Sequence, residues 1–565
     1  MEFVVFTGVL LFIFLFMIVQ ELMQAKNEEK MFRNSLLENY GKEPPKEYSL
    51  ERFARLDSYL ERHKEEKQLD DITWNDLGMD EVFCRIDRTL SAAGEEYLYF
   101  TLRNIFCGKE KLDHLEEVTG WFLEQDDTRI RVQLLLKKLG HLGKYSLYDY
   151  LDNLDYLGER NNRKILLLNL LYLLFASLLF VQPAVGILGI VVCMLGHILT
   201  YFREKKVIEP YITSFAYVLR MINVCEELGR QKIPVYKKEL EDLNEALKSL
   251  WELKRGSFWV MAGNQGKIGG NPLDIIADYL RMILHLDIWQ FNLMLRKLRL
   301  KTNEVDRLLG ITGYLDMAIS VGGFRRSLEG YCIPQLEENA NKVYLHMEGG
   351  WHPLLTHPVK NSIRADRGVL LTGSNASGKS TFLKMVAVNA VLAQTIHTCT
   401  AESYHAPVFR IFSSMALRDS IQNGESYYIV EIRSLKRILD AAQTETAPVL
   451  SFVDEVLRGT NTVERIAAAT QILIHLSESG VLCFTATHDI EMTDCYDNYH
   501  FEEVIRDGDI SFPYELLPGR AGTRNAIRLL ALMGYDKEIT ERAAMQAEDF
   551  IQTGKWSVQT LLGNT

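Results

Sequence analysis

The hydrophobic pattern of this chain contains two long stretches without a charged residue, and the first spans Phe3 to Gln20. A helix of about 18 apolar residues can cross a bilayer. Met1-Glu2 supplies no positive charge before this stretch, and no small-residue cleavage site follows it, so we expect an uncleaved anchor and not a secretory signal. Because Lys26, Lys30 and Arg33 come next, the C-terminal side of the anchor is expected in the cytoplasm.

The second uncharged stretch, Ile165 to Phe202, is interrupted near its middle by Gln182-Pro183. This pattern predicts two short apolar helices joined by a tight turn, each close to the lower length limit for crossing a membrane. A buried helical hairpin in a soluble core is the alternative. Basic residues at both ends favour a membrane hairpin whose two ends lie in the cytoplasm. These residues are Arg160, Arg163 and Lys164 before the stretch, and Arg203, Lys205 and Lys206 after it.

Helical periodicity dominates most of the remaining N-terminal part of the chain. Apolar residues recur at helical spacing from Asp70 to Leu157. Lys237 to Lys254 alternates acids and bases around leucines, which is typical of a helix with one solvated face. Leu280 to Leu309 predicts a long helix or a pair of helices, and Gly263 to Gly270 predicts a loop. Long helices that meet at such a glycine-rich tip would form a lever.

The strongest chemical signal is a glycine-rich loop between a short apolar strand, Gly368 to Leu371, and a helical stretch, Thr381 to Ala393. Its pattern, GxxxxGK[ST], is that of a P-loop, in which backbone N–H groups and a helix N-terminus surround phosphate oxygens. Lys379 is expected to reach the β- and γ-phosphates of ATP, and Ser380 to hold Mg²⁺. The residues expected to contact the nucleotide here are Gly373, Ser374, Ala376, Ser377, Gly378, Lys379, Ser380 and Thr381.

Two further apolar strands end in candidate catalytic side chains. Val449 to Val453 is followed by Asp454 and Glu455, the pattern of a Walker B strand. Asp454 is expected to bind Mg²⁺ and Glu455 to polarise the attacking water. A third strand, at 481–485, is followed closely by His488, which is expected to sense the γ-phosphate or position water; a structural strand-end histidine is the alternative.

Composition adds limits. The net charge of −12 over 565 residues provides no global basic field for nucleic acid, although a local basic face is compatible with it. The eight cysteines, at 84, 107, 193, 225, 332, 399, 483 and 495, include no CxxC pair. Neither a zinc site nor a disulfide framework is therefore indicated, and reduced cytosolic thiols are the simpler expectation.

Six ordered segments of the C-terminal part resemble the ATPase domain of the MutS mismatch-repair superfamily. TGSNASGKSTFLK, DEVLRGTNT and FTATHD are similar to its P-loop, its Walker B segment and its following histidine motif. GGWHPLL lies upstream of them, GESYYIVEI (424–432) resembles the family signature, and PGRAGTRNAIRLLALMGY (518–535) the closing motif. A weaker resemblance to the family's helical core includes the DITWNDL stretch beginning at Asp71 and, after it, the Ala93-Gly94-Glu95 segment.

The resemblance implies an ATP- and Mg²⁺-dependent ATPase that works as a homodimer with shared sites and binds DNA. Asn375 would orient water and the γ-phosphate, and Ser426 would complete the partner subunit's nucleotide site. The chain departs from the family pattern mildly in the signature, at Tyr427-Tyr428, and again in the closing motif, at 524–527. A mismatch-reading domain has no room before residue 70, and the DNA clamp could be only a stub near 255–270.

The expected fold class is a multidomain α and α/β protein: transmembrane helices and a helical core or lever, followed by a P-loop NTPase domain of the ABC/MutS type. The expected domains are an anchor at 1–23, a charged linker at 24–69, a helical core at 70–164, a transmembrane hairpin at 165–202, a lever at 203–335, the ATPase domain at 336–550 and a tail at 551–565.

Two functions remain open from the sequence. One is a multi-pass protein of the cytoplasmic membrane whose ATPase domain faces the cytoplasm and which binds mismatched or structured DNA. The other is a membrane-tethered, ATP-driven switch that acts on a protein or lipid partner without DNA. An ABC transporter subunit fits poorly, because no LSGGQ stretch occurs.

Overall fold

The computed structural model divides the chain into two compact units, which are described separately. The first comprises residues 1–64, 86–101 and 113–327, and the second residues 65–85, 102–112 and 328–565. Described residues run from 2 to 556, without 45–47, 49, 66–67, 106–107, 143–145, 255–281, 339, 341, 375–376, 416–426, 445–446, 458–459, 493, 507–508, 522–525 and 555. The described part of the chain is mostly helical, and the second unit also contains mixed β-sheets.

The first unit is built from helices. They are α1 (Glu2–Asn39), α2 (Leu50–Arg62), α5 (Ala92–Arg103), α6 (Lys109–Glu124), α7 (Asp126–Leu139), α8 (Leu147–Leu151), α9 (Arg163–Leu178), α10 (Pro183–Leu228), α11 (Lys237–Lys254), α14 (Leu286–Leu298) and α15 (Thr302–Arg326). The stretch expected at Lys237 to Lys254 forms α11 with the same bounds. The stretch expected at Leu280 to Leu309 contributes to two helices, α14 and the longer α15. The glycine-rich tip at 263–270 lies outside the described residues.

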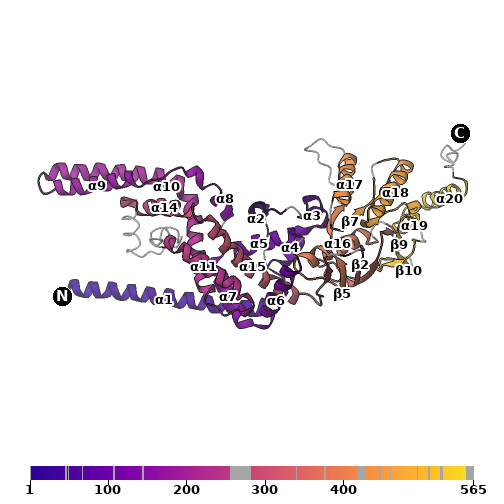
Figure 1. The fold of residues 1–565 in the computed structure, drawn as a ribbon, viewed down its shortest axis with the longest axis horizontal. Coiled ribbons are helices and arrows are strands. Elements are labelled where there is room, and N and C mark those ends of the chain that lie inside the picture. The colour runs from indigo at the N-terminus through magenta and orange to yellow at the C-terminus, as the bar shows by residue number, and fades with distance from the viewer. Residues whose placement is uncertain are drawn as a thin grey trace. The chain divides into compact units, whose positions relative to one another are not determined.

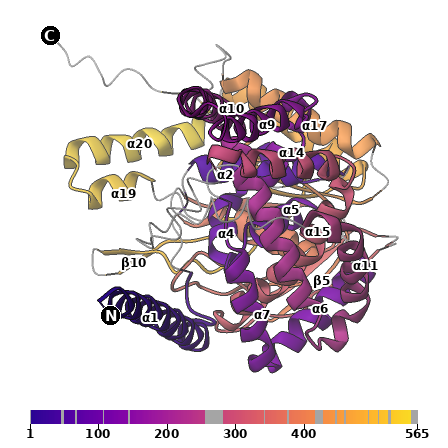
Figure 2. The same cartoon turned by 90° about the vertical axis from the view of Figure 1, so that its left-hand side faces the viewer.

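Helices α9 and α10 form the predicted hairpin and lie side by side in both views (Figure 1, Figure 2). The second helix does not end with the uncharged stretch at Phe202, as expected, but continues through Pro210 to Leu228. The physical reason is that its C-terminal half has its own buried face, which includes Phe215 and Ile222. This face packs into the helical unit, so the helix is held past the charged residues that follow the apolar stretch.

The apolar half of the hairpin is exposed. Leu167, Leu173 and Leu188 are each more than 60% exposed, and 17% of the most apolar 18-residue window of α10 is buried. Among the described residues, α10 is the one helix long and apolar enough to cross a membrane. Helix α9 has 16 residues, slightly below the roughly 17 needed to span a bilayer. These exposed side chains therefore do not fit the alternative in which the hairpin is buried in a soluble core.

A buried polar contact fixes the packing of α15 on the start of α5. Asp316 accepts hydrogen bonds from the Ser91 hydroxyl at 2.6 Å and from the Ser91 backbone N–H at 2.9 Å. A Cβ atom at Gly94 would lie 2.5 Å from the Asp316 side chain, so only glycine allows this close approach. The resemblance of the Ala93-Gly94-Glu95 segment to a family motif thus corresponds to a packing requirement.

The second unit contains two main sheets. Their strands are β1 (Gln335–Glu337), β2 (Leu345–Gly350), β3 (Asn361–Ala365), β4 (Val369–Thr372), β5 (Ser403–Pro407), β6 (Arg410–Ser414), β7 (Val449–Asp454), β8 (Leu482–Ala486), β9 (Asp497–His500) and β12 (Leu517–Pro518). A four-stranded sheet has the order β1-β5-β2-β3, and a six-stranded sheet the order β12-β9-β4-β8-β7-β6. Strands β4, β6, β7, β8 and β9 are mutually parallel, so their carboxyl ends share one edge. A separate hairpin pairs β10 (Val504–Arg506) with β11 (Asp509–Ser511).

Helices complete the second unit. They are α3 (Asp71–Leu77), α4 (Met79–Ile86), α16 (Lys379–Thr395), α17 (Tyr427–Thr444), α18 (Thr462–Glu478), α19 (Ala526–Leu532) and α20 (Lys537–Thr553) (Figure 1). Helices α17 and α18 bury one apolar cluster against the large sheet, whereas α16 packs on strands of both sheets.

The helix α3 belongs to the second unit, although the sequence assigned the stretch from residue 70 to a helical core. It packs on the edge strand β6, where the Ser413 hydroxyl donates to Asp76 at 2.7 Å and the Ser413 N–H donates to Thr73 at 3.1 Å. Both acceptors are buried, so these bonds satisfy polar groups that would otherwise be costly inside the protein. The DITWNDL stretch therefore extends the second unit.

Candidate functional site

The loop after β4 places the glycine-rich motif at the carboxyl edge of the parallel strands. Strand β4 is fully buried, and α16 begins at Lys379, directly after Gly378. Gly373 has φ +139°, and a Cβ atom there would lie 2.6 Å from the Phe501 carbonyl oxygen. Only glycine fits this backbone conformation and contact. The sequence thus forms a tight turn that directs the N-terminus of α16 toward the loop interior.

Lys379 and Ser377 are the buried polar side chains of this loop. The Lys379 ammonium donates to the carbonyl oxygens of Gly373 at 2.9 Å and Ser374 at 2.8 Å. Burial lowers the pKa of Lys379, whereas Asp454, Glu455 and other nearby carboxylates oppose this shift. The Ser377 hydroxyl is buried, and no hydrogen bond joins it to any residue that the structure describes. The same loop therefore presents the positive charge of Lys379 and the hydroxyl group of Ser377.

Ser380 and Asp454 meet across two elements that are far apart in the sequence. The Ser380 hydroxyl, in the first turn of α16, donates to Asp454 Oδ2 at 2.5 Å, at the end of β7. Burial raises the pKa of Asp454, while the hydrogen bond from Ser380 lowers it and the charge of Glu455 raises it further. Ser380 and Asp454 thus bring together two oxygen ligands of the kind that Mg²⁺ prefers. The Asp454 carboxylate is costly to ionise in this buried position without a cation.

Glu455 and His488 form the next pair along the same edge. Glu455 has φ +58°, an uncommon conformation outside glycine, and its N–H donates to the Ala486 carbonyl at 2.9 Å. Its Oε1 lies 3.1 Å from His488 Nε2, after the end of β8. The parallel pairing of β7 with β8 brings these two residues together. His488 therefore contacts the carboxylate expected to polarise water.

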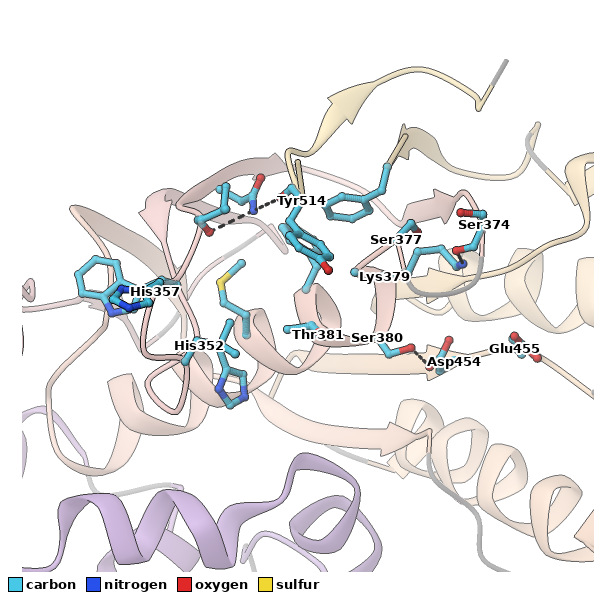
Figure 3. Close-up of a pocket in the computed structure, with 18 residues that line it drawn as sticks. His352, His357, Ser374, Ser377, Lys379, Ser380, Thr381, Asp454, Glu455 and Tyr514 are labelled. Carbon is cyan, nitrogen blue, oxygen red and sulfur yellow. Dashed lines mark hydrogen bonds between the residues drawn. The ribbon is translucent and has the colours of Figure 1, made fainter. Parts of the chain in front are cut away.

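A cavity of about 460 Å³ opens beside the loop. Figure 3 shows His352, His357 and Tyr514 on one side of the loop, with Asp454 and Glu455 on the other. Asn361 holds the Tyr514 segment, because its amide donates to the Tyr514 carbonyl at 2.9 Å and accepts from the Leu516 N–H at 2.7 Å. Burial lowers the pKa of His352 to about 4, so this side chain is neutral at pH 7. The predicted residues that line the cavity are Ser374, Ser377, Gly378, Lys379, Ser380, Thr381, Asp454 and Glu455.

Several residues around the loop were not identified from the sequence. Glu503 accepts a hydrogen bond from the Ser374 hydroxyl at 2.8 Å. Glu431, on α17, accepts from the Leu457 N–H and so fixes the chain just after β7. Both are distant in sequence from the loop. No local motif marks Glu503, whereas Glu431 lies inside the family-like 424–432 segment, in which a role was expected only for Ser426. Three predicted residues, Asn375, Ala376 and Ser426, lie outside the described part of the chain.

A family model for MutS domain V matches residues 369–551. This range begins at β4 and includes the loop, Asp454, Glu455 and His488. Through this region the chain is similar to domain V of the MutS family. Similar curated proteins include a DNA mismatch repair protein MutS of Natronomonas pharaonis, 34% identical over 229 residues, which cover 38% of this chain and 26% of that protein.

Two other relatives match over a comparable range. The DNA mismatch repair protein MutS of Thermus aquaticus is 34% identical over 223 residues, or 38% of this chain and 26% of the relative. The DNA mismatch repair protein MutS 2 of Haloarcula marismortui is 35% identical over 182 residues, or 31% and 19%. The match thus spans about a quarter or less of these MutS-family relatives.

Proposed function

We propose that this MutS-family protein binds ATP with Mg²⁺ at the Gly373–Ser380 loop and hydrolyses it. The observation that carries the proposal is the convergence of Lys379, Ser380 and Asp454 at the N-terminus of α16, beside a cavity of about 460 Å³. That volume lies within the range of small-molecule sites. Bound ATP supplies the phosphoanhydride bond, and Mg²⁺ supplies a cation that neutralises phosphate charge.

The residues fit the triphosphate. Lys379 contributes a buried positive charge, and its two present acceptors are backbone carbonyls that phosphate oxygens can replace as stronger partners. The orphaned Ser377 hydroxyl gains an acceptor. The N-terminus of α16 adds backbone N–H groups and a favourable dipole. Gly373, Ser374, Gly378 and Thr381 form the surrounding backbone. The roles proposed for Ala376 and Asn375, which lie outside the described residues, rest on the family resemblance alone.

The same edge holds the groups for Mg²⁺ and water. Ser380 and Asp454 are the residues that would hold the cation, and its charge would compensate the cost of the buried Asp454 charge. Glu455 accepts a proton from the attacking water or polarises it. We assign His488 a positioning role, because its 3.1 Å contact fixes the Glu455 carboxylate. Hydrolysis then proceeds by orientation and electrostatic stabilisation.

Nucleotide binding can be tested by titrating purified full-length protein in detergent with a fluorescent ATP analogue and Mg²⁺. The Lys379→Ala variant should bind at least tenfold more weakly, because alanine cannot replace a charge-assisted phosphate contact. Lys537→Ala, an exposed lysine at the start of α20, is the charge-matched control and should bind normally. Equal affinity of both variants would refute the proposed phosphate site.

Shared sites in a homodimer are part of the proposal. Ser426 precedes α17, and a hydroxyl at a helix N-terminus can contact phosphate across a two-fold interface. The support is the family resemblance of the 424–432 segment. A second subunit would therefore complete each nucleotide site.

DNA is the proposed partner because the relatives are named DNA mismatch repair proteins. The second candidate is a switch that acts on a protein or lipid without DNA, and the exposed apolar α9–α10 hairpin favours it. ATP turnover measured with no DNA, perfect duplex, mismatched duplex and branched DNA separates the two. A DNA-dependent change in turnover supports the first candidate, and identical turnover in all four samples supports the second.

We further propose that the chain lies in the cytoplasmic membrane, with 1–23 and the 165–202 hairpin inserted and the ATPase domain in the cytoplasm. Exposed leucines on α9 and α10 would be costly in water over so large a patch. The first half of α1 and the hairpin also point to the same side of the helical unit (Figure 1, Figure 2).

Cysteine labelling in intact cells tests this topology. An impermeant thiol reagent should label a cysteine introduced at Val181, which is 76% exposed at the hairpin turn. It should not label one introduced at Glu241 on α11, which belongs to the cytoplasmic part. Labelling at 241 without labelling at 181 would contradict the proposed orientation.

A further inference from the structure

Two cysteines of the second unit face each other across an isolated antiparallel bridge. The Cys332 N–H donates to the Cys399 carbonyl at 3.0 Å, and the Cys399 N–H donates to the Cys332 carbonyl at 3.0 Å. Residues that exchange both backbone bonds have Cα atoms about 5.5 Å apart. Disulfides usually join Cα atoms about 4.4 to 6.8 Å apart, so the Cα spacing typical of such a bridge lies inside the range found for disulfides. Both thiols are free.

The two thiols differ in access and in acidity. Cys332 is partly exposed, whereas Cys399 is fully buried. The neighbouring Cys399 side chain lowers the pKa of Cys332, while burial raises the pKa of Cys399 well above its usual value. The Cys399 thiol itself donates to the Asn389 carbonyl at 3.5 Å. The thiolate is the reactive form of cysteine, so the accessible member of the pair is the one that reacts with an oxidant. The buried member lies ready as the resolving thiol.

The bridge connects a segment that follows α15 with a segment that follows α16. Cys332 follows the end of α15, soon after the chain enters the second unit at Leu328. Cys399 follows α16, the helix that begins at the phosphate loop. The next residue, Thr400, donates from its hydroxyl to the Trp351 carbonyl at 2.6 Å, and Trp351 lines the cavity. A disulfide between Cys332 and Cys399 would therefore connect the segment that follows α15 to the residues that contact Trp351 at the cavity.

We propose that Cys332 and Cys399 form a reversible disulfide when the protein meets a hydroperoxide. The Cys332 thiolate attacks one peroxide oxygen, so an S–O bond forms, the O–O bond breaks, and the leaving oxygen takes up a proton as water or an alcohol. The Cys399 sulfur then attacks the Cys332 sulfenic acid. The S–S bond forms, the S–O bond breaks, and the hydroxide leaves as water with the Cys399 proton. One peroxide is reduced and two thiols are oxidised.

The test uses full-length protein in detergent, treated with hydrogen peroxide, quenched with an alkylating reagent, digested and analysed by mass spectrometry. We expect a peptide pair linked through residues 332 and 399, two hydrogens lighter than the reduced pair, which disappears after treatment with dithiothreitol. Cys495 is the matched control, because it is also partly exposed but burial raises its pKa. It should stay reduced while the pair is oxidised.

Variants keep the proposal falsifiable. Cys332→Ser should abolish the crosslink and leave Cys399 reduced, since the buried thiol cannot meet the oxidant first. Cys399→Ser should leave a sulfenic acid on Cys332 that a cyclic 1,3-dione traps. If Cys399→Ser fails to fold, the wild-type crosslink and the Cys332→Ser result still decide the question. Oxidation of Cys495 before the pair, or oxidised Cys332 without a link to Cys399, would overturn the proposal.

Discussion

Replacing Glu455 by glutamine isolates the proposed catalytic charge from the fold. Glutamine keeps the length of the side chain and an oxygen that can face His488, which lies 3.1 Å from the carboxylate. The Glu455 N–H bond to Ala486 is a backbone contact and is unchanged. Ser380 and Asp454 are untouched, so Mg²⁺ and nucleotide binding should survive. The expected effect is therefore confined to the step in which water is activated.

The size of this effect follows from the role. A positioned general base accelerates a reaction by about 10²- to 10⁴-fold, so kcat should fall by that factor. Each factor of ten corresponds to about 1.36 kcal/mol, so the activation barrier should rise by about 2.7 to 5.4 kcal/mol. Single-turnover hydrolysis measures the chemical step, and equilibrium titration measures ATP affinity. Glu478→Gln, an exposed glutamate at the far end of α18, is the control. A Glu455→Gln variant that hydrolyses ATP within threefold of wild type would refute the assigned role.

Three further outcomes are expected. Asp454→Asn should raise the melting temperature without Mg²⁺, because burial raises the Asp454 pKa and its charge destabilises the folded state at pH 7, yet it should abolish Mg²⁺-dependent turnover; a lower melting temperature would contradict this. The titration of His352 should lower the unfolding free energy of the wild type by about 2 kcal/mol between pH 7.5 and 5. The folded-state pKa of His352 is about 4, whereas the unfolded state takes up a proton below about pH 6.5. Denaturant titration of His352→Gln should lack this component, while the exposed His357→Gln should retain it. Mixed Ser426→Ala and Lys379→Ala subunits, each inactive alone, should regain about one working site per dimer; no recovery in crosslinked heterodimers would exclude shared sites.

Local sequence patterns predicted the elements that depend on near neighbours. The strand–loop–helix unit around Lys379 follows from an apolar run, glycines and a helical stretch, and β4 and α16 lie where that pattern puts them. The contact between Glu455 and His488 was not predicted, because it depends on the non-local pairing of β7 with β8, whose carboxyl ends share an edge. Fold and site could be predicted to this extent because short-range rules determine them.

Long-range packing produced what the sequence could not indicate. Tyr514 lines the cavity, and its backbone carbonyl accepts a hydrogen bond from Asn361 on strand β3, 153 residues earlier in the chain. The continuation of α10 to Leu228 depends on an apolar face that becomes visible once its neighbours are in place, whereas the charged residues after Phe202 suggested an end. The pairing of Cys332 with Cys399 likewise depends on a single antiparallel bridge, and no cysteine spacing reports it.

The central claim is ATP hydrolysis at the loop that carries Lys379. The most direct measurement is phosphate release from ATP by full-length protein in detergent, with Mg²⁺ and with excess EDTA, for wild type and Lys379→Ala. The account predicts Mg²⁺-dependent release by the wild type, none above background in EDTA, and none by a Lys379→Ala protein whose melting temperature is unchanged. Equal phosphate release by wild type and a well-folded Lys379→Ala protein would contradict it.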